Sequence, residues 1–140
     1  MVINRKYCEP AEAMPVTEIV PETSPFFDYN AKYTAGATQE ITPAQIDDEL
    51  AEQIRDYAWR CHEILMCEGV SRTDFILSGE GDLYILETNT IPGMTETSFV
   101  PQVARVSGMT FGDFLDLLIN YAMEKGVSKP ELNREIINKK

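Results

Sequence analysis

The sequence is poor in basic side chains and in histidine. Lysine and arginine together number 12 against 23 aspartates and glutamates, the formal net charge is -11, and there is one histidine. Nucleic-acid binding needs clustered cations for the phosphates, so this balance argues against a nucleic-acid partner. An acidic chain that acts on a polyphosphate would need metal ions and a few well-placed cations.

Cysteine is also scarce, and long apolar runs are absent. The three cysteines form no Cys-x-x-Cys pair, and no segment reaches the length of a membrane-spanning helix. The first residues run into Cys8-Glu9-Pro10 without the apolar core of a secretion signal. We therefore expect a soluble protein of the cytosol, where thiols stay reduced, with no membrane partner.

The length and the apolar content allow a real core. With 140 residues, of which 44% are hydrophobic, the chain is one domain by size or a piece of a larger one. No internal repeat is visible.

The most informative stretch joins a predicted strand to a turn. Residues 84–86 are the strand formers Tyr-Ile-Leu, Glu87 and Asn89 follow two positions apart, and Pro92-Gly93 breaks the strand. Strand alternation places Glu87 and Asn89 on one face. A second strand-forming run, residues 70–77, precedes the polar turn at residues 78–81, so a β-hairpin with a loop of two or four residues is expected.

The expected pairing of this hairpin brings four polar groups together. Arg72 should lie opposite Glu87, with Asp74 one diagonal step from Glu87 and Asn89 on the same face. Two carboxylates and an amide oxygen, without histidine or cysteine, favour Mg²⁺ or Mn²⁺ over Zn²⁺. The alternative is a solvated face with an Arg72 to Glu87 pair and an Asn89 that only starts the turn, but four polar groups on one face favour a site.

The rest of the chain predicts further strands and a long helix. Residues 2–7 and 13–20 flank a turn and suggest a short antiparallel pair. A helix of about five turns starts either at Thr42, with Gln45 three residues on, or at the acidic residues 47–49. The single histidine, His62, lies beside its apolar stripe and is expected at the boundary of the core rather than in catalysis.

Two more helices are expected after the hairpin. Ser98 can cap a short helix that Gly108 ends, and Thr110 can open another with Asp113 three residues later. Free amides at the first helix start, with the Ser98 hydroxyl, are suited to a carboxylate or a phosphate, although capping alone is the default explanation for Ser98.

Residues 26–38 hold four aromatic residues and Lys32 but follow neither helical nor strand periodicity. They predict either an ordered surface loop or a flap that closes over a ligand, with Lys32 meeting an anion.

Four motifs taken together resemble a known family. They are residues 26–33 (Phe-Phe-Asp-Tyr-Asn-Ala-Lys-Tyr), 72–74 (Arg-Thr-Asp), 86–95 (Leu-Glu-Thr-Asn-Thr-Ile-Pro-Gly-Met-Thr) and 98–101 (Ser-Phe-Val-Pro). This set closely resembles the C-terminal half of the D-alanine-D-alanine ligases, which belong to the ATP-grasp superfamily. The resemblance implies an α+β fold, the C-terminal lobe of an ATP-grasp domain with an antiparallel sheet packed with helices, over residues 1–126. Residues 127–140 are expected to be a polar tail, as a frayed helix or disordered.

The resemblance also implies an activity. Such enzymes use ATP to join two D-alanines for peptidoglycan in the cytoplasm, through an acyl phosphate and with two Mg²⁺ or Mn²⁺ ions. The implied roles are oxyanion stabilisation by Arg72 and the Gly93 amide, phosphate binding by Lys32, substrate binding by Tyr33, Ser98 and Phe99, nucleotide contacts by Lys32, Phe26 and Leu86, and metal binding by Asp74, Glu87 and Asn89. Tyr33 matches the position associated with accepting an amine rather than D-lactate.

The sequence departs from the family pattern in two ways. Phe27 and Asn30 stand where relatives commonly show Tyr and Glu. The family's N-terminal and central domains, which would be this lobe's partners, cannot be located in the sequence, so we expect a fragment of a bit under half of the enzyme that is inactive alone. Apolar surface exposed where those domains dock could make it self-associate. The alternatives are a non-catalytic lobe that binds Mg²⁺ or nucleotide and a ligase that accepts D-lactate.

Overall fold

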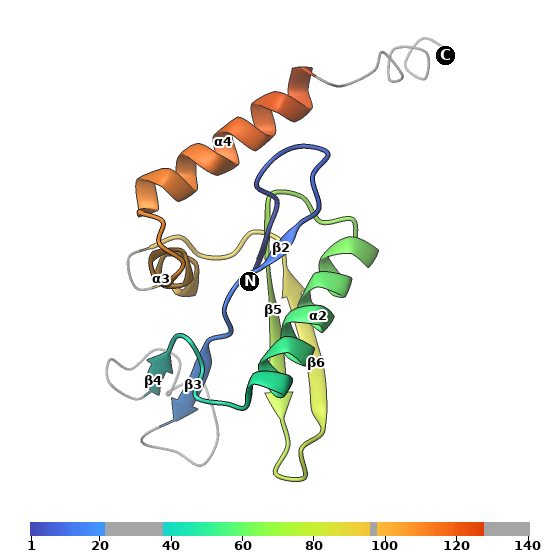
Figure 1. Ribbon diagram of the computed structural model, residues 1–140, viewed down its shortest axis with the longest axis vertical. Coiled ribbons are helices and arrows are strands. Elements are labelled where there is room, and N and C mark those ends of the chain that lie inside the picture. The colour runs from blue at the N-terminus through green and yellow to red at the C-terminus, as the bar shows by residue number, and fades with distance from the viewer. Residues whose placement is uncertain (22–37, 96–97, 128–140) are drawn as a thin grey trace, which may run out of the picture.

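The computed structural model describes residues 1–21, 38–95 and 98–127. Within them, the strands are β1 (Val2–Ile3), β2 (Glu12–Ala13), β3 (Glu18–Pro21), β4 (Thr38–Ile41), β5 (Val70–Leu77) and β6 (Leu83–Asn89), and the helices are α2 (Asp48–Ile64), α3 (Phe99–Val106) and α4 (Phe111–Val127). A four-stranded antiparallel sheet runs in the order β2-β1-β5-β6, and β3 pairs with β4 in a separate two-stranded sheet (Figure 1). The expected α+β arrangement is confirmed.

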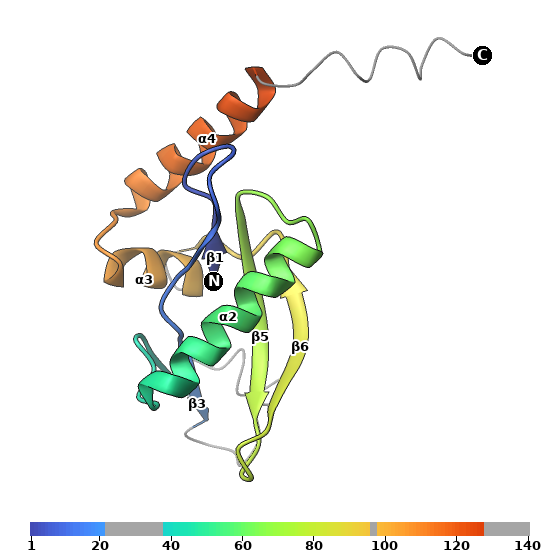
Figure 2. The same cartoon turned by 45° about the vertical axis from the view of Figure 1, so that its right-hand side comes forward.

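The four-stranded sheet is buried on both faces near β1. Val2 packs with Ala58 of α2 on one face, while Ile3, its neighbour in the strand, packs with Val100 of α3 and Phe114 of α4 on the other. Val2, Ile3 and Phe114 are all fully buried. Successive side chains of a strand point to opposite faces, so this short strand joins two apolar layers. Both views show α2 running diagonally across β5 (Figures 1 and 2).

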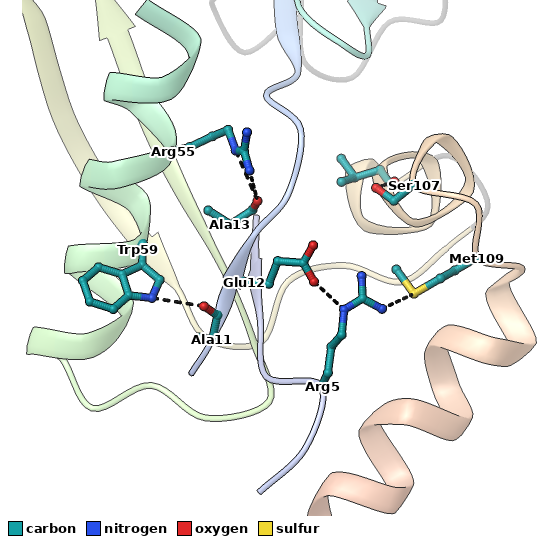
Figure 3. Close-up of polar contacts among 9 residues, drawn as sticks. Arg5, Ala11, Glu12, Ala13, Arg55, Trp59, Ser107 and Met109 are labelled. Atoms are coloured by element: carbon teal, nitrogen blue, oxygen red, sulfur yellow. Dashed lines mark hydrogen bonds and ion pairs between the residues drawn. The ribbon is translucent and has the colours of Figure 1, made fainter. Parts of the chain in front are cut away.

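The edge strand β2 is covered by side chains rather than by another strand. Arg55 of α2 donates from Nε and Nη2 to the carbonyl of Ala13, at 3.2 and 3.0 Å, and the indole of Trp59 donates to the carbonyl of Ala11 at 3.1 Å (Figure 3). Pairing with side-chain donors protects an edge from pairing with another chain.

The predicted strand over residues 13–20 is wrong in extent. The pairing with β1 ends at Ala13, and the chain re-enters a sheet only at Glu18, where Val20 faces Gln39 of β4. Pro15 lies at the break, and a proline cannot donate to a strand ladder.

The long helix starts at the later of the two predicted positions. Asp47 is the N-cap of α2, and Asp48 and Glu49 lie in its first turn, where carboxylates interact favourably with the helix dipole. Thr42 lies outside the helix, and its hydroxyl is hydrogen-bonded to that of Thr17 at 2.7 Å. The 17 residues of α2 agree with the expected five turns.

The two later helices are confirmed. Ser98 is the N-cap of α3, and Gly108 follows that helix with a positive φ of 80°, a conformation that favours glycine. Before α4, the Asp113 amide donates to Thr110 Oγ1 at 3.1 Å, and the Thr110 amide donates to Asp113 Oδ2 at 2.9 Å. These bonds to Thr110 lower the pKa of Asp113. The pair forms a reciprocal cap of the kind the sequence predicts.

Some predictions fall on residues outside those described. They are the flap at residues 26–38, with Phe26, Lys32 and Tyr33, of which only residue 38 is described, and the tail at residues 128–140. No helix in the described part of the chain is both long enough and apolar enough to cross a membrane.

Candidate functional site

The β5-β6 hairpin holds the predicted cluster, with a different register. Next to the turn, Leu77 faces Leu83. A β-bulge after Asp74 then shifts the pairing further, so that Asp74 faces Glu87. Arg72 therefore faces Asn89, and the predicted position of Arg72 directly opposite Glu87 in the sheet is wrong, although the two side chains still approach each other diagonally.

The turn explains part of the shift. β5 ends at Leu77 and β6 begins at Leu83, so the connection is longer than the two or four residues expected. The Ser78 amide donates to the carbonyl of Asp82 at 2.8 Å, and the Ser78 hydroxyl accepts from the Asp82 amide at 3.0 Å. Gly81 supplies the positive φ, 92°, that this closure needs.

The corrected register brings the two carboxylates closer than the sequence predicts. Asp74 and Glu87 are direct cross-strand neighbours rather than diagonal ones, and such neighbours have Cβ atoms roughly 5 Å apart. On the opposite face, the hydroxyls of Thr73 and Thr88 are hydrogen-bonded at 3.0 Å. The polar groups of the site therefore share one face, as expected.

Arg72 is held by Asp74 in a two-point contact. Its Nε donates to Asp74 Oδ1 at 2.7 Å and its Nη2 to Asp74 Oδ2 at 2.8 Å, and Nη2 lies 3.9 Å from Glu87 Oε1. The side chains of Arg72 and Asp74 are 22% and 35% exposed, whereas that of Glu87 is 65% exposed. The guanidinium is therefore fixed in place, while Glu87 is free to turn toward a ligand.

The same guanidinium reaches the start of α3. The Arg72 Cζ lies over the ring of Phe99, 5.6 Å from its centroid, which is a cation-π arrangement. The resemblance assigns Phe99 to substrate binding and implies no contact of its ring with Arg72. The ring contact joins residues far apart in the sequence, and no spacing signal predicts it.

Asn89 serves the turn through one hydrogen bond to its amide oxygen. Its Oδ1 accepts from the Ile91 amide at 2.9 Å, so the simpler interpretation of Asn89 as a turn residue holds. An amide oxygen can accept twice, so this bond does not prevent coordination of a cation.

The donor set fits a magnesium-type ion. No cluster of three or more His, Cys, Asp or Glu side chains suited to a metal occurs among the residues described. Asp74, Glu87 and the Asn89 oxygen supply oxygen ligands only, and hard cations such as Mg²⁺ and Mn²⁺ prefer these.

The turn after β6 brings Gly93 against Ser98. A Cβ at Gly93 would lie 3.0 Å from the Ser98 Oγ, so a side chain there would displace the hydroxyl. Ser98 Oγ accepts from the Thr95 amide at 3.1 Å and lies 2.8 Å from Thr95 Oγ1. It makes no side-chain capping bond to α3, and the first turn of α3 carries no acidic residue. The Ser98 side chain itself therefore leaves the free amides at the start of α3 available.

The apolar surface beside the carboxylates is uncovered. Leu86, the predicted nucleotide contact, is 59% exposed, and Ile76, Tyr84 and Ile85 of the same hairpin are also exposed.

The prediction that His62 lies at the boundary of the core is wrong. It is 1% exposed, inside the protein rather than at the boundary of the core. Its two ring nitrogens are hydrogen-bonded to Ser71 and Asn4. Ser71 directly precedes Arg72, but nothing in the residue spacing indicates that it meets His62.

A family model and a curated protein similar in sequence both bear the name of D-alanine--D-alanine ligases. Residues 3–120 match the family model described as "D-ala D-ala ligase C-terminus". The chain is 56% identical over 119 residues to a D-alanine--D-alanine ligase of Desulfotalea psychrophila, covering 84% of this chain and 37% of that protein.

Two solved structures are similar in fold. The D-alanine--D-alanine ligase of Bacillus anthracis, solved in complex with ATP, superposes with a TM-score of 0.65 at 32% identity, over 82% of this chain and 38% of that one. The VanG D-Ala:D-Ser ligase of Enterococcus faecalis superposes with a TM-score of 0.68 at 36% identity, over 86% and 34%. The chain thus spans somewhat more than a third of the length of these proteins.

Proposed function

Because the chain belongs to the D-alanine-D-alanine ligase family through its C-terminal domain, we propose that it carries the metal site and the oxyanion site of an ATP-dependent ligase. That ligase joins two D-alanines for peptidoglycan synthesis in the cytoplasm. One D-alanine carboxylate attacks the γ-phosphate and releases ADP. The amine of the second D-alanine then displaces phosphate from the acyl phosphate, leaving D-alanyl-D-alanine.

The observation that carries the proposal is the two-point Arg72 to Asp74 contact directly opposite Glu87. It places a fixed cation and two carboxylates on one face, which a reaction with developing phosphate charge requires. Asp74, Glu87 and Asn89 would hold two Mg²⁺ or Mn²⁺ ions, whose charge would offset the negative charge of the phosphates.

The groups of this chain have separate tasks in that scheme. Arg72, held by Asp74 and the Phe99 ring, donates to the oxyanion of the tetrahedral intermediate together with the Gly93 amide. Gly93 can do this because it has no side chain to push against Ser98.

The second D-alanine binds at the start of α3. Its carboxylate meets the Ser98 hydroxyl and the amide of Phe99, at a helix end that attracts anions. As the resemblance implies, Lys32 and Tyr33 would bind this substrate, and Phe26 and Leu86 would contact the nucleotide.

A second candidate differs only in the second substrate. The likeness to a D-Ala:D-Ser ligase favours D-serine as an alternative to the second D-alanine. The D-lactate alternative is disfavoured by Tyr33, as the resemblance implies.

A chimeric enzyme tests the proposal. Residues 3–120 of this chain replace the matching part of the Desulfotalea psychrophila ligase, and phosphate release and dipeptide formation are measured with ATP, Mg²⁺ and D-alanine. Parallel reactions replace the second substrate with D-serine or D-lactate, and the 140-residue chain is assayed alone.

We expect D-alanyl-D-alanine from the chimera and no turnover by the chain alone. Arg72→Met in the chimera is the matched control of low activity, and loss of about a hundredfold in kcat is expected from removing one oxyanion donor. A chimera that is folded by circular dichroism and gel filtration but makes no dipeptide would refute the proposal.

A further inference from the structure

A buried polar network lies behind the candidate site. His62 Nδ1 is 2.8 Å from Ser71 Oγ, and His62 Nε2 is 3.0 Å from Asn4 Oδ1. Asn4, His62 and Ser71 are all buried, and their network joins the end of β1, the last turns of α2 and the start of β5. Among the described residues, no buried side-chain nitrogen or oxygen lacks a hydrogen-bond partner.

The partners define the protonation of the ring. Asn4 presents its amide oxygen, which only accepts, and this orientation of the amide assigns the proton to His62 Nε2. In the neutral ring Nδ1 is then the acceptor, and the Ser71 hydroxyl donates to it. Burial lowers the pKa of His62, with Glu63 opposing it, and this keeps the ring neutral.

Ser71 couples this network to the site. It precedes Arg72 in β5, so the two side chains point to opposite faces of the sheet. A second anchor lies close by, because the Asn4 amide donates to the carbonyl of Gly69 at 2.8 Å. The position of β5 beneath Arg72 is thus set from behind by hydrogen bonds rather than only by apolar packing.

We propose that His62 is a positioning residue for the ligase reaction, acting through Ser71 on β5 to hold Arg72 in place. This inference rests on the proposed function. His62 touches no substrate and takes no proton from one. Its effect is on the placement of the guanidinium, where an error of about 1 Å can cost roughly a hundredfold in rate.

The variants separate positioning from stability. His62→Ala removes both ring bonds, and Ser71→Ala removes only the link to β5. His62→Asn keeps a polar atom near the Nδ1 position, and His62→Gln keeps one near Nε2. Ala58→Gly is the matched control, because it weakens the packing of α2 on the sheet without touching the network.

The first measurement uses the chain itself. The ¹H-¹⁵N signal of Arg72 Nε, assigned by its loss in Arg72→Lys, reports the hydrogen bond to Asp74. We expect it to shift or broaden in His62→Ala and Ser71→Ala and to stay unchanged in Ala58→Gly. Long-range ¹H-¹⁵N spectra of wild type should show the neutral ring with the proton on Nε2.

The second measurement uses the chimeric ligase. We expect kcat to fall about tenfold to a hundredfold in His62→Ala and Ser71→Ala with little change in the KM for ATP, because the lost interaction acts in the transition state. His62→Asn should retain more activity than His62→Gln, since only the former can still pair with Ser71.

Each outcome decides the inference. An unchanged Arg72 signal in Ser71→Ala, equal kcat losses in His62→Ala and Ala58→Gly, or better activity in His62→Gln than in His62→Asn would overturn it. If the wild-type chimera makes no dipeptide, the proposed function fails, and the Arg72 signal in the chain still decides whether His62 positions that residue.

Discussion

The contact between Arg72 and Asp74 can be tested by a double-mutant cycle. The variants are Arg72→Met, Asp74→Asn and the double variant, each compared with wild type in the 140-residue chain. The cycle isolates the energy of the pair from the other effects of each substitution.

The structure supplies the expected magnitude. At an effective dielectric constant of about 20, two unit charges about 4 Å apart attract by roughly 4 kcal/mol. Desolvation and the ordering of two side chains offset much of this, and fully exposed pairs retain only about 0.2–1 kcal/mol. The Arg72 and Asp74 side chains are 22% and 35% exposed and make two bonds of 2.7 and 2.8 Å. We therefore expect a coupling energy of about 1.5 kcal/mol.

Urea unfolding provides the assay. The chain has a single tryptophan, Trp59, which packs α2 onto β2 through its bond to Ala11 and reports on unfolding by fluorescence. The exposed pair Lys6 and Glu9, with side chains 64% and 52% exposed, is the matched control. Its cycle with Lys6→Met and Glu9→Gln should give less than about 0.5 kcal/mol.

A coupling energy for Arg72 and Asp74 no larger than that of the control pair would refute the two-point contact. Without that contact, the guanidinium has no fixed position on this face, and its proposed role as an oxyanion donor loses its structural basis.

Three other predictions follow from the same geometry. Gly93→Ala should lower the unfolding free energy by about 1–2 kcal/mol, because the new methyl group presses on Ser98. Urea titrations should show a smaller loss in the Ser98→Ala background, and an equal loss in both backgrounds would contradict the contact. In the chimera, Glu87→Ala should abolish metal-dependent turnover with the fold unchanged by circular dichroism, while Glu80→Ala in the exposed turn should not; retained activity in Glu87→Ala would exclude Glu87 as a metal ligand. The unfolded chain binds a proton on His62 at higher pH than the folded chain, since burial lowers the folded pKa below 6.5; unfolding free energy should therefore fall as pH drops through about 6.5, and His62→Gln should lack this component.

The sequence predicts local features of this fold well. The reciprocal cap of Thr110 and Asp113 and the glycine after α3 depend on residues a few positions apart, and both occur. Strand alternation also places Glu87 and Asn89 on one face, and Asp74 shares that face because the shifts at the turn and at the bulge add up to two residues. Such features are set by steric and hydrogen-bonding preferences of neighbouring residues.

The register of the hairpin could not be predicted from the residue spacing. The pairing depends on the geometry of the turn, and here the Asp82 amide donates a hydrogen bond to the Ser78 hydroxyl. The bulge after Asp74 adds a further shift that no periodicity indicates. Contacts between distant segments, such as Arg72 with Phe99 and His62 with Asn4, are set by tertiary packing, so residue spacing does not predict them.

The packing of α3 explains why the two parts of the site stay together. Arg72 belongs to the sheet, but its guanidinium lies over Phe99, the first residue of α3, and Ser98 precedes that residue. The helix is seated by Val103, which is 2% exposed in the cluster that also contains Ile3. A substitution that shifts α3 therefore moves Ser98 and the aromatic support of Arg72 at once. The core under α3 is consequently the part of the fold whose precise shape the proposed chemistry needs most.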